Sequence, residues 1–191
     1  MPTGDAGLVV RPVRPSDFDD LRATYYRLYD ERDAGEPIGI TLFASRPSLE
    51  DEVAWYDRAY ARFTAGDSIF LVADRNGRVV GNCVIDRAAP VAASESGHVG
   101  ELGILVREEF RGQGVGSALL HRALEEARSK FEVVYLTVFS VNTRAQRLYE
   151  RFGFTVCGHL PRAVKRGDRY FDEERMVLVF GESPGAPQAN R

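Results

Sequence analysis

A strand pattern that runs without a break into a glycine-rich turn and an amphipathic helix most restricts how this chain can fold. Residues 98–106 (HVGELGILV) have the strand pattern, residues 111–116 (RGQGVG) are half glycine, and residues 117–127 repeat apolar side chains at helical spacing. Glycine tolerates positive φ angles and lets another molecule approach the backbone. The turn therefore has two interpretations: a tight connection required by packing, or a cradle of main-chain N–H groups for a phosphate.

The composition is that of an ordinary globular protein. The chain has 191 residues, of which 44% are hydrophobic and 28% charged, enough for one domain with its own core. We expect a single domain over residues 8–180, with flexible ends at 1–7 and 181–191. Lys and Arg number 25 against 28 Asp and Glu, a net charge of −3. Such a balance gives no general attraction to nucleic acid or to an anionic membrane.

Cys83 and Cys157 are the only cysteines, too few for a disulfide framework or a cysteine-rich metal site. We expect both to be small buried apolar side chains, and we expect no metal. The first residues lack the cationic and apolar segments of a signal peptide. The apolar runs fall short of the ~18 residues of a membrane helix. A reducing cytoplasm is therefore the expected location.

Capping and turn signals divide the first half of the chain. Ser16 with Asp19, and Ser48 with Asp51, have the spacing of a capping box ahead of a helical pattern. Asn76-Gly77 between two β-rich runs is typical of a type I′ hairpin turn. The loop at 35–48 is of the kind that borders binding sites. The predicted elements are a strand at 8–13, helices at 16–31 and 49–63, and a hairpin over 68–86.

The second half alternates strands and helices. After the small polar connection at 89–97 and the glycine turn, the predicted elements are a strand at 133–139, a helix at 142–154 and two strands at 154–160 and 175–180. Gly153 stands where a left-handed helix terminator belongs. This order predicts an α/β (α+β) protein with a mixed sheet of about seven strands and helices on both faces.

The glycine turn differs from the common nucleotide motifs. Gly112, Gly114 and Gly116 follow G-x-G-x-G rather than the dinucleotide G-x-G-x-x-G, and the Lys-Ser/Thr of a P-loop is missing. Free N–H groups at the start of the next helix still favour a phosphate. Arg111 adds a positive charge there.

Two blocks together resemble the GNAT superfamily of acyl-CoA-dependent N-acetyltransferases. Residues 101–120 contain the R/Q-x-x-G-x-G/A motif at Arg111, Gly114 and Gly116. Residues 136–154 match N-x-x-A-x-x-L-Y-x-x-x-G-F at Asn142, Ala145, Leu148, Tyr149, Gly153 and Phe154. The resemblance implies a mostly antiparallel sheet splayed between its two middle strands, with acetyl-CoA as cosubstrate and an amine as acceptor.

The resemblance also implies where acetyl-CoA binds. The pantetheine arm would pair with a bulged strand segment, and a backbone N–H near Leu105 would polarise the thioester carbonyl. Asn142 is either a helix N-cap or a contact of the cofactor arm, and the two roles are compatible. The implied cofactor-binding residues are Ile104, Leu105 and Val106 for pantetheine, Arg111, Gly112, Gln113, Gly114, Val115, Gly116 and Ser117 for the pyrophosphate, and Asn142.

Tyr149 is the predicted general acid. An aromatic residue on the apolar face of a helix is usually a core residue, but the matching tyrosine of the family protonates the departing thiolate. A phenol with a pKa near 10 facing a thiol with a pKa near 8.5 is able to pass its proton as charge builds on sulfur.

The general base is open between Glu101 and ordered water. Removing a proton at pH 7 costs about 4.6 kcal/mol for a lysine amine but only about 1–1.4 kcal/mol for an α-amine. Some relatives that act on α-amines carry a glutamate where this chain has Thr137, which cannot serve. Glu101 lies one strand earlier and faces the same gap if side chains alternate, although a strand glutamate is also often just solvated or ion-paired. His98 is more typical of a surface residue.

The acceptor site is expected from residues before Pro47 and after Gly158, with Tyr170 and Asp172 as candidates. The residues do not choose between a protein N-terminus, a polyamine, an amino acid and an aminoglycoside. We predict an enzyme that transfers acetyl directly from acetyl-CoA to a primary amine, as a monomer or homodimer. The alternatives are a non-catalytic CoA-binding module of the same fold and a nucleotide-binding protein.

Overall fold

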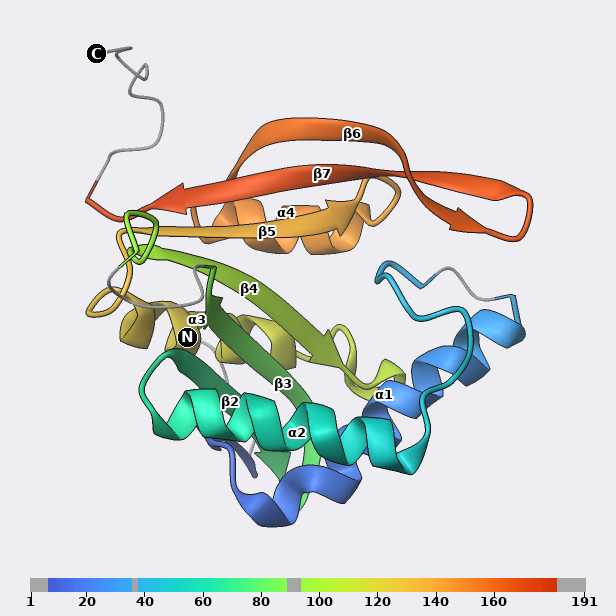
Figure 1. Ribbon diagram of the computed structural model, residues 1–191, viewed down its shortest axis with the longest axis horizontal. Coiled ribbons are helices and arrows are strands. Elements are labelled where there is room, and N and C mark those ends of the chain that lie inside the picture. The colour runs from blue at the N-terminus through green and yellow to red at the C-terminus, as the bar shows by residue number, and fades with distance from the viewer. Residues whose placement is uncertain (1–6, 36–37, 89–93, 182–191) are drawn as a thin grey trace.

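The computed structural model describes residues 7–35, 38–88 and 94–181, and all strands in these ranges join one sheet (Figure 1). The strand order is β1-β2-β3-β4-β5-β7-β6, and every neighbouring pair is antiparallel except β4 with β5. The strands are β1 (Leu8–Pro12), β2 (Ser68–Arg75), β3 (Arg78–Arg87), β4 (Val99–Val106), β5 (Val133–Phe139), β6 (Thr155–Arg166) and β7 (Arg169–Val179). The helices are α1 (Phe18–Asp33), α2 (Leu49–Thr64), α3 (Val115–Ala127) and α4 (Thr143–Arg151), with 3-10 turns η1 (Pro15–Asp17) and η2 (Glu108–Phe110).

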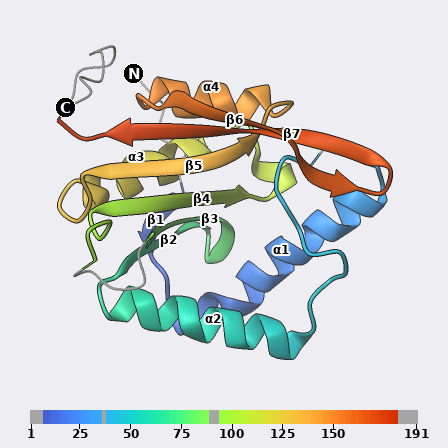
Figure 2. The same cartoon turned by 45° about the horizontal axis from the view of Figure 1, so that its top comes forward.

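Helices cover both faces of the sheet, as predicted (Figure 2). Side chains alternate along β2, so Ile69 and Leu71 join one apolar core with α3 and α4, whereas Phe70 and Val72 join a second core with α1 and α2. The predicted mixed, mostly antiparallel sheet of seven strands is therefore confirmed.

The two middle strands separate soon after they meet. β4 pairs with β5 only where Val99–Glu101 lies beside Val133–Tyr135. Its pairing with β3 continues from Gly100 to Val106 without a register shift. The predicted splay is confirmed, but the bulge expected in this strand is not found. Unbroken alternation then places Glu101, Gly103 and Leu105 on the same face of the sheet.

Local sequence signals predicted the backbone correctly at two positions and wrongly at a third, where other residues bind the capping side chain. Asn76 and Gly77 have φ angles of 55° and 83°, as a type I′ turn requires, and Ser48 forms the predicted capping box with Asp51. The capping box predicted at Ser16 is wrong, because α1 begins only at Phe18 after η1. The carboxylate of Asp17 accepts hydrogen bonds from the Arg14 N–H at 2.7 Å and from Arg11 at 2.8 Å, which sets a different start.

The last hairpin is longer than predicted. β6 ends only at Arg166, and β7 already begins at Arg169. The added residues form a charged stretch that lacks the alternation of a half-buried strand. A register shift between Leu160 and Val164 accommodates Pro161 in β6. Cys157 lies exposed on β6, so its predicted burial is wrong, whereas Cys83 is buried as expected.

Parts of the prediction fall outside the described residues. Nearly all of the expected flexible ends, 1–7 and 181–191, and half of the 89–97 connection belong to the ranges not described. In the ranges that are described, no helix combines the length and apolar character needed to cross a membrane.

Leu120→Ala tests the core between α3 and the sheet. Leu120 is 0% exposed, so the substitution is expected to lower the free energy of unfolding by about 2–5 kcal/mol through lost burial and a cavity. Leu49→Ala, at a position that is 55% exposed on α2, is the matched control and should change it by less than about 1 kcal/mol. Urea unfolding measures both; equal losses would contradict this core assignment.

Candidate active site

The glycine turn between β4 and α3 adopts the geometry of an anion cradle. Gly112 and Gly114 have φ angles of 83° and 84°, which only glycine adopts readily. Gly114 is the N-cap of α3, has no side-chain cap, and would place a Cβ in open space. The first intrahelical bond of α3 runs from Ala118 N to Gly114 O, so the N–H groups of residues 115–117 have no acceptor within the helix. These free donors at the positive end of the helix dipole fit a phosphate.

Gly116 has a different task. A Cβ there would come within 3.3 Å of Leu148 Cδ2, and within about 4 Å of Val106 and Ile104. Because Gly116 has no Cβ, α3 approaches α4 and β4 closely. The packing interpretation of the glycine motif therefore holds at Gly116, whereas the backbone at Gly112 and Gly114 is compatible with the cradle interpretation.

Arg111 is already paired on the protein side. Its guanidinium bonds both oxygens of Glu31 on α1, at 3.1 and 2.9 Å, and donates to the Val106 carbonyl at 3.0 Å. The Glu31 side chain is only 9% exposed, so most of the charge of Arg111 is neutralised. Its side chain ties the turn to α1 rather than supplying free positive charge.

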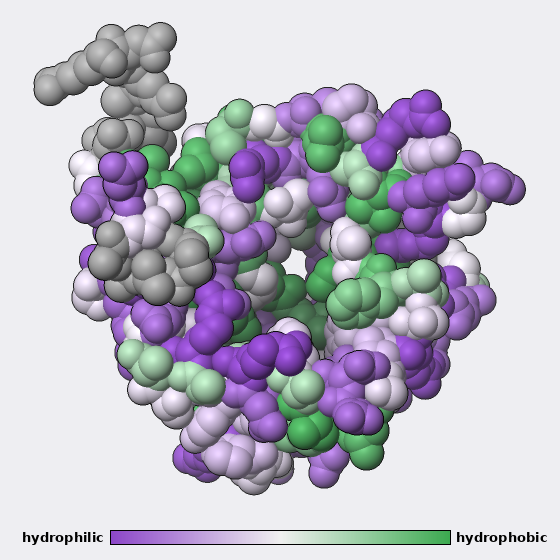
Figure 3. Space-filling view, viewed as in Figure 1, coloured by the Kyte–Doolittle hydropathy of each residue, from purple (hydrophilic) through white to green (hydrophobic). Residues whose placement is uncertain are grey.

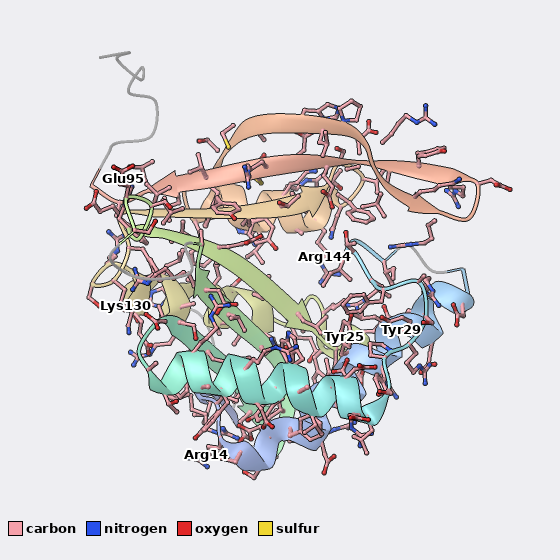
Figure 4. All side chains as sticks on the ribbon, viewed as in Figure 1. Arg14, Tyr25, Tyr29, Glu95, Lys130 and Arg144 are labelled. Atoms are coloured by element: carbon pink, nitrogen blue, oxygen red, sulfur yellow. The ribbon has the colours of Figure 1, made fainter. Side chains whose placement is uncertain are left out.

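Arg144, which the sequence reasoning missed, brings a second guanidinium to this turn. A Cβ on Gly112 would lie 2.8 Å from Arg144 Nη2, and the Arg144 guanidinium has no hydrogen bond or ion pair with a described residue. Figure 4 labels it beside the open end of the splay. Arg144 stands in the first turn of α4, where a cation opposes the helix dipole. That unfavourable position was the signal in the sequence.

The other predicted cofactor residues surround this turn. Ile104, Leu105 and Val106 form the end of β4 that lacks β5 as a neighbour. Asn142 caps α4 through a bond from the Ala145 N–H at 3.2 Å, which confirms its N-cap interpretation. Gln113 bonds Arg75 and the Glu109 carbonyl, both at 2.7 Å.

Tyr149 projects from α4 into the core on the α3 side of the sheet. It is 7% exposed and lies edge-on to Phe154 at 6.0 Å between ring centroids. No described residue hydrogen-bonds its hydroxyl. Burial raises the pKa of Tyr149, which keeps the phenol protonated at neutral pH. Burial also raises the pKa of the nearby Cys83 thiol to about 12, so Cys83 is no thiolate nucleophile.

Glu101 lies on the opposite face, in a large cleft. Its Oε2 accepts a hydrogen bond from the Tyr135 hydroxyl at 2.9 Å. Its cross-strand neighbour is Asp86, whose pKa is raised by burial and lowered in part by Arg62, 3.4 Å away. The two carboxylates and Arg62 form one polar end of the cleft.

The cleft has a volume of about 940 Å³ and lies between α1, α2, the loop that joins them, and strands β3 and β4. Figure 3 shows the face hollowed near its centre. Its walls are largely aromatic and apolar, with several charged groups. The lining residues used below are Phe18, Arg22, Tyr25, Ile40, Phe43, Glu52, Trp55, Tyr56, Arg58, Arg62, Asp86, Glu101 and Leu105.

Only half of the acceptor prediction agrees with this cleft. The segment before Pro47 lines it, but Tyr170 and Asp172 lie on the β6–β7 hairpin, where Arg162 contacts both, and neither lines the cleft. His98 is exposed just before β4, as expected. No group of three or more metal-ligating side chains occurs in the described part of the chain.

Glu52 on α2 is the acidic residue that the sequence reasoning missed. It is 6% exposed, lines the cleft, and has no hydrogen-bond partner among the described residues. Burial raises its pKa, against the partial opposing effect of Arg22. Its helical spacing from Tyr56 puts Glu52 on the buried face of α2, but only the apolar residues of this helix had been assigned to that face.

Glu52→Gln is expected to stabilise the protein at pH 8 more than at pH 4. Because the pKa of Glu52 is raised in the folded state, stability is lost as pH rises through that pKa and the buried group ionises. Glutamine removes the ionisation. Urea unfolding at both pH values measures the effect. Glu50→Gln, exposed in the first turn of the same helix, is the control and should be slightly destabilising at pH 8. A Glu52→Gln effect independent of pH would contradict the assignment.

Comparison with known proteins agrees with this geometry. Residues 25–154 match the Acetyltransferase (GNAT) family. The chain is 30% identical over 140 residues to the L-methionine sulfoximine/L-methionine sulfone acetyltransferase of Pseudomonas paraeruginosa, covering 73% of this chain and 78% of that protein.

Solved structures give the same result. The ribosomal-protein-alanine N-acetyltransferase of Brucella melitensis is 27% identical with a TM-score of 0.74, covering 90% of this chain and 99% of that one. The yncA protein of Salmonella typhimurium, solved with its cofactor acetyl-CoA, is 24% identical with a TM-score of 0.77, covering 96% and 99%. The predicted enzyme, rather than a non-catalytic module, is confirmed. The chain belongs to the GNAT family and is an acetyl-CoA-dependent N-acetyltransferase.

Proposed function

We propose that this enzyme acetylates the α-amine of a free amino acid or a close analogue, bound in the cleft between α1, α2 and β4. The observation that carries the proposal is the size and lining of the cleft. Ile40, Phe43 and Pro47 of the α1–α2 loop line it together with both helices and the sheet. Its volume of about 940 Å³ is in the range of small-molecule sites.

The loop is held in place by both halves of the molecule. Arg166 of β6 donates to the Ile38 and Ile40 carbonyls at 3.3 and 3.0 Å. Tyr26 of α1 donates to the Pro47 carbonyl at 2.8 Å. The name of the Pseudomonas paraeruginosa relative, which specifies amino-acid derivatives, also supports an amino-acid acceptor.

The charged groups of the cleft match a zwitterion. Arg58 and Arg62 of α2 line the cleft and suit the α-carboxylate, because a guanidinium binds carboxylates in two-point fashion. Glu101 suits the α-ammonium group. An α-amine with a pKa near 8 loses its proton at pH 7 for only about 1–1.4 kcal/mol, so a carboxylate or a water molecule that it orders is an adequate base.

The reaction uses both faces of the sheet. The α-amine, deprotonated by Glu101, attacks the thioester carbonyl from the cleft side, and the carbonyl oxygen accepts a hydrogen bond from the backbone near Leu105. The carbon–sulfur bond then breaks, and Tyr149 donates its phenolic proton to the departing sulfur from the α4 side. The splay between β4 and β5 is where the two sides meet. Tyr135 holds Glu101 in place through the 2.9 Å bond.

Chemistry in the splay requires acetyl-CoA to lie along β4. The free N–H groups at the start of α3 and the unpaired guanidinium of Arg144 are suited to its phosphates. The backbone of Ile104–Val106, which has β3 as a neighbour on one edge only, is suited to pair with pantetheine.

Glu101→Gln is expected to lower kcat/KM for α-amine acceptors at pH 7 by about 100-fold, the usual contribution of a general base. The loss should shrink above pH 9, where the free amine predominates. Initial rates of thiol release from acetyl-CoA measure this. Glu95→Gln, on an exposed turn, is the control. An unchanged rate at pH 7 would show that Glu101 is not the base.

Arg144→Ala is expected to weaken coenzyme A binding about tenfold, corresponding to about 1.4 kcal/mol, and the difference from wild type should fall at high salt. Isothermal titration calorimetry measures the affinity. Arg147→Ala, exposed on the same helix, is the matched control and should bind normally. Equal affinities of wild type and Arg144→Ala would remove Arg144 from the phosphate site.

A further inference from the structure

A carboxylate and a guanidinium face the α1–α2 end of the cleft with unused hydrogen-bonding capacity. Glu52 is 6% exposed and has no hydrogen-bond partner among the described residues. Arg22 gives only Nη2 to Asp19, at 3.0 Å, and its Nε is enclosed without a partner. The Arg22 charge acts on Glu52, yet no contact within 4.0 Å joins these two side chains. The Glu52 oxygens and the remaining N–H donors of Arg22 are therefore available to a molecule bound in the cleft.

The tyrosine hydroxyls on the surrounding walls already have partners. The Tyr56 hydroxyl donates to the Arg14 carbonyl at 2.7 Å, and the Tyr25 hydroxyl lies 3.3 Å from that of Tyr29. Phe18 and Trp55 complete the lining with apolar surface. Glu52, which has no partner among the described residues, and Arg22 are therefore the groups at this end best able to bind a ligand.

This end of the cleft lies beside the reacting end of β4. Arg107, the residue after β4, is buried and donates through Nε to Thr24 Oγ1 of α1 at 2.7 Å. Thr24 lies between Arg22 and Tyr25 on the same helix. An acceptor whose amine reaches the backbone near Leu105 thus extends its other end toward Arg22 and Glu52.

The opposite charges of Glu52 and Arg22 restrict the chemistry of the acceptor's end that lies far from its reacting amine. An ammonium group would be attracted by Glu52 and repelled by Arg22, and a carboxylate would meet the reverse. An alkyl end would leave both polar groups buried and unsatisfied, which costs about 1–3 kcal/mol for each group. A neutral group with one N–H donor and one oxygen acceptor satisfies both.

We propose that Glu52 and Arg22 form a specificity subsite for an acceptor with a neutral, hydrogen-bonding side-chain end, such as a carboxamide or ureido group. The N–H of that group donates to the Glu52 carboxylate, and its oxygen accepts from the Arg22 guanidinium. This inference rests on the proposed acetylation of amino acids and names the class of amino acid.

The test compares four acceptors of similar length: L-glutamine, L-norleucine, L-glutamate and L-lysine. We expect kcat/KM for glutamine to exceed that for norleucine by about 100-fold, because a site built to hydrogen-bond a group rejects its alkyl analogue. Glutamate and lysine should both fall well behind glutamine. Thiol release from acetyl-CoA gives the rates.

Two variants should shift the acceptor preference away from glutamine, one toward glutamate and the other toward lysine. In Glu52→Gln the cleft loses a negative charge while Arg22 keeps its positive charge and its exposed partner Asp19, so the glutamate-to-glutamine ratio of kcat/KM should rise at least tenfold. In Arg22→Met the Glu52 charge is uncompensated, so the lysine-to-glutamine ratio should rise by a similar factor. Glu50→Gln on the same turn of α2 is the control and should leave both ratios unchanged. A coenzyme A-dependent rise in Tm shows that each variant is folded.

Three outcomes overturn the inference. Equal turnover of norleucine and glutamine by the wild type overturns this inference but leaves the proposed acetylation of amino acids standing. An equal loss for all four acceptors in Glu52→Gln, with a shifted pH profile, also overturns it, because Glu52 would then act on the reacting amine. Turnover of none of the four overturns the proposed function and this inference with it.

Discussion

The early end of the pairing between β4 and β5 is the constraint on which the rest of the structure depends. The two strands share only three residue pairs before they diverge, while β3 continues to hold β4 and β7 continues to hold β5. The sheet is therefore rigid on both sides of an opening whose edges are main chain. Tyr149 lies in the core on the side of α3 and α4, and Glu101 lines the cleft on the side of α1 and α2. The proposed acid and base therefore lie on opposite faces of the sheet.

Charge is distributed around this opening so that some groups are neutralised and others are left available. Arg111 beside the glycine turn is paired with Glu31, whereas Arg144 against Gly112 has no partner among the described residues. In the cleft, Arg62 approaches Asp86, whereas Glu52 has no hydrogen-bond or ion-pair partner among the described residues. A buried carboxylate without a partner reduces stability, so the position of Glu52 on the cleft wall supports its proposed role in binding.

The sequence predicted the fold well because its signals are local. The Asn76-Gly77 turn, the Ser48 cap and the glycine turn each determine backbone conformation within a few residues. It failed at Ser16, where Asp17 is captured by Arg11, a residue from a neighbouring strand, and in β6, where pairing with β7 overrides a charged composition. In the site, motif spacing indicated the residues near β4 and α4. Sequence position marks Arg144 in the first turn of α4 and Glu52 on the buried face of α2, but it does not show that these side chains lack protein partners, because three-dimensional packing decides which side chains are paired.

Acetyl-CoA is proposed to lie in the splay, with its phosphates at the start of α3. A crystal structure of the complex with coenzyme A would test this placement. We expect phosphate oxygens within hydrogen-bond distance of the N–H groups of Val115, Gly116 and Ser117, and pantetheine paired with the backbone of residues 104–106. Coenzyme A bound with its phosphates away from this turn, or pantetheine outside the opening between β4 and β5, would contradict it.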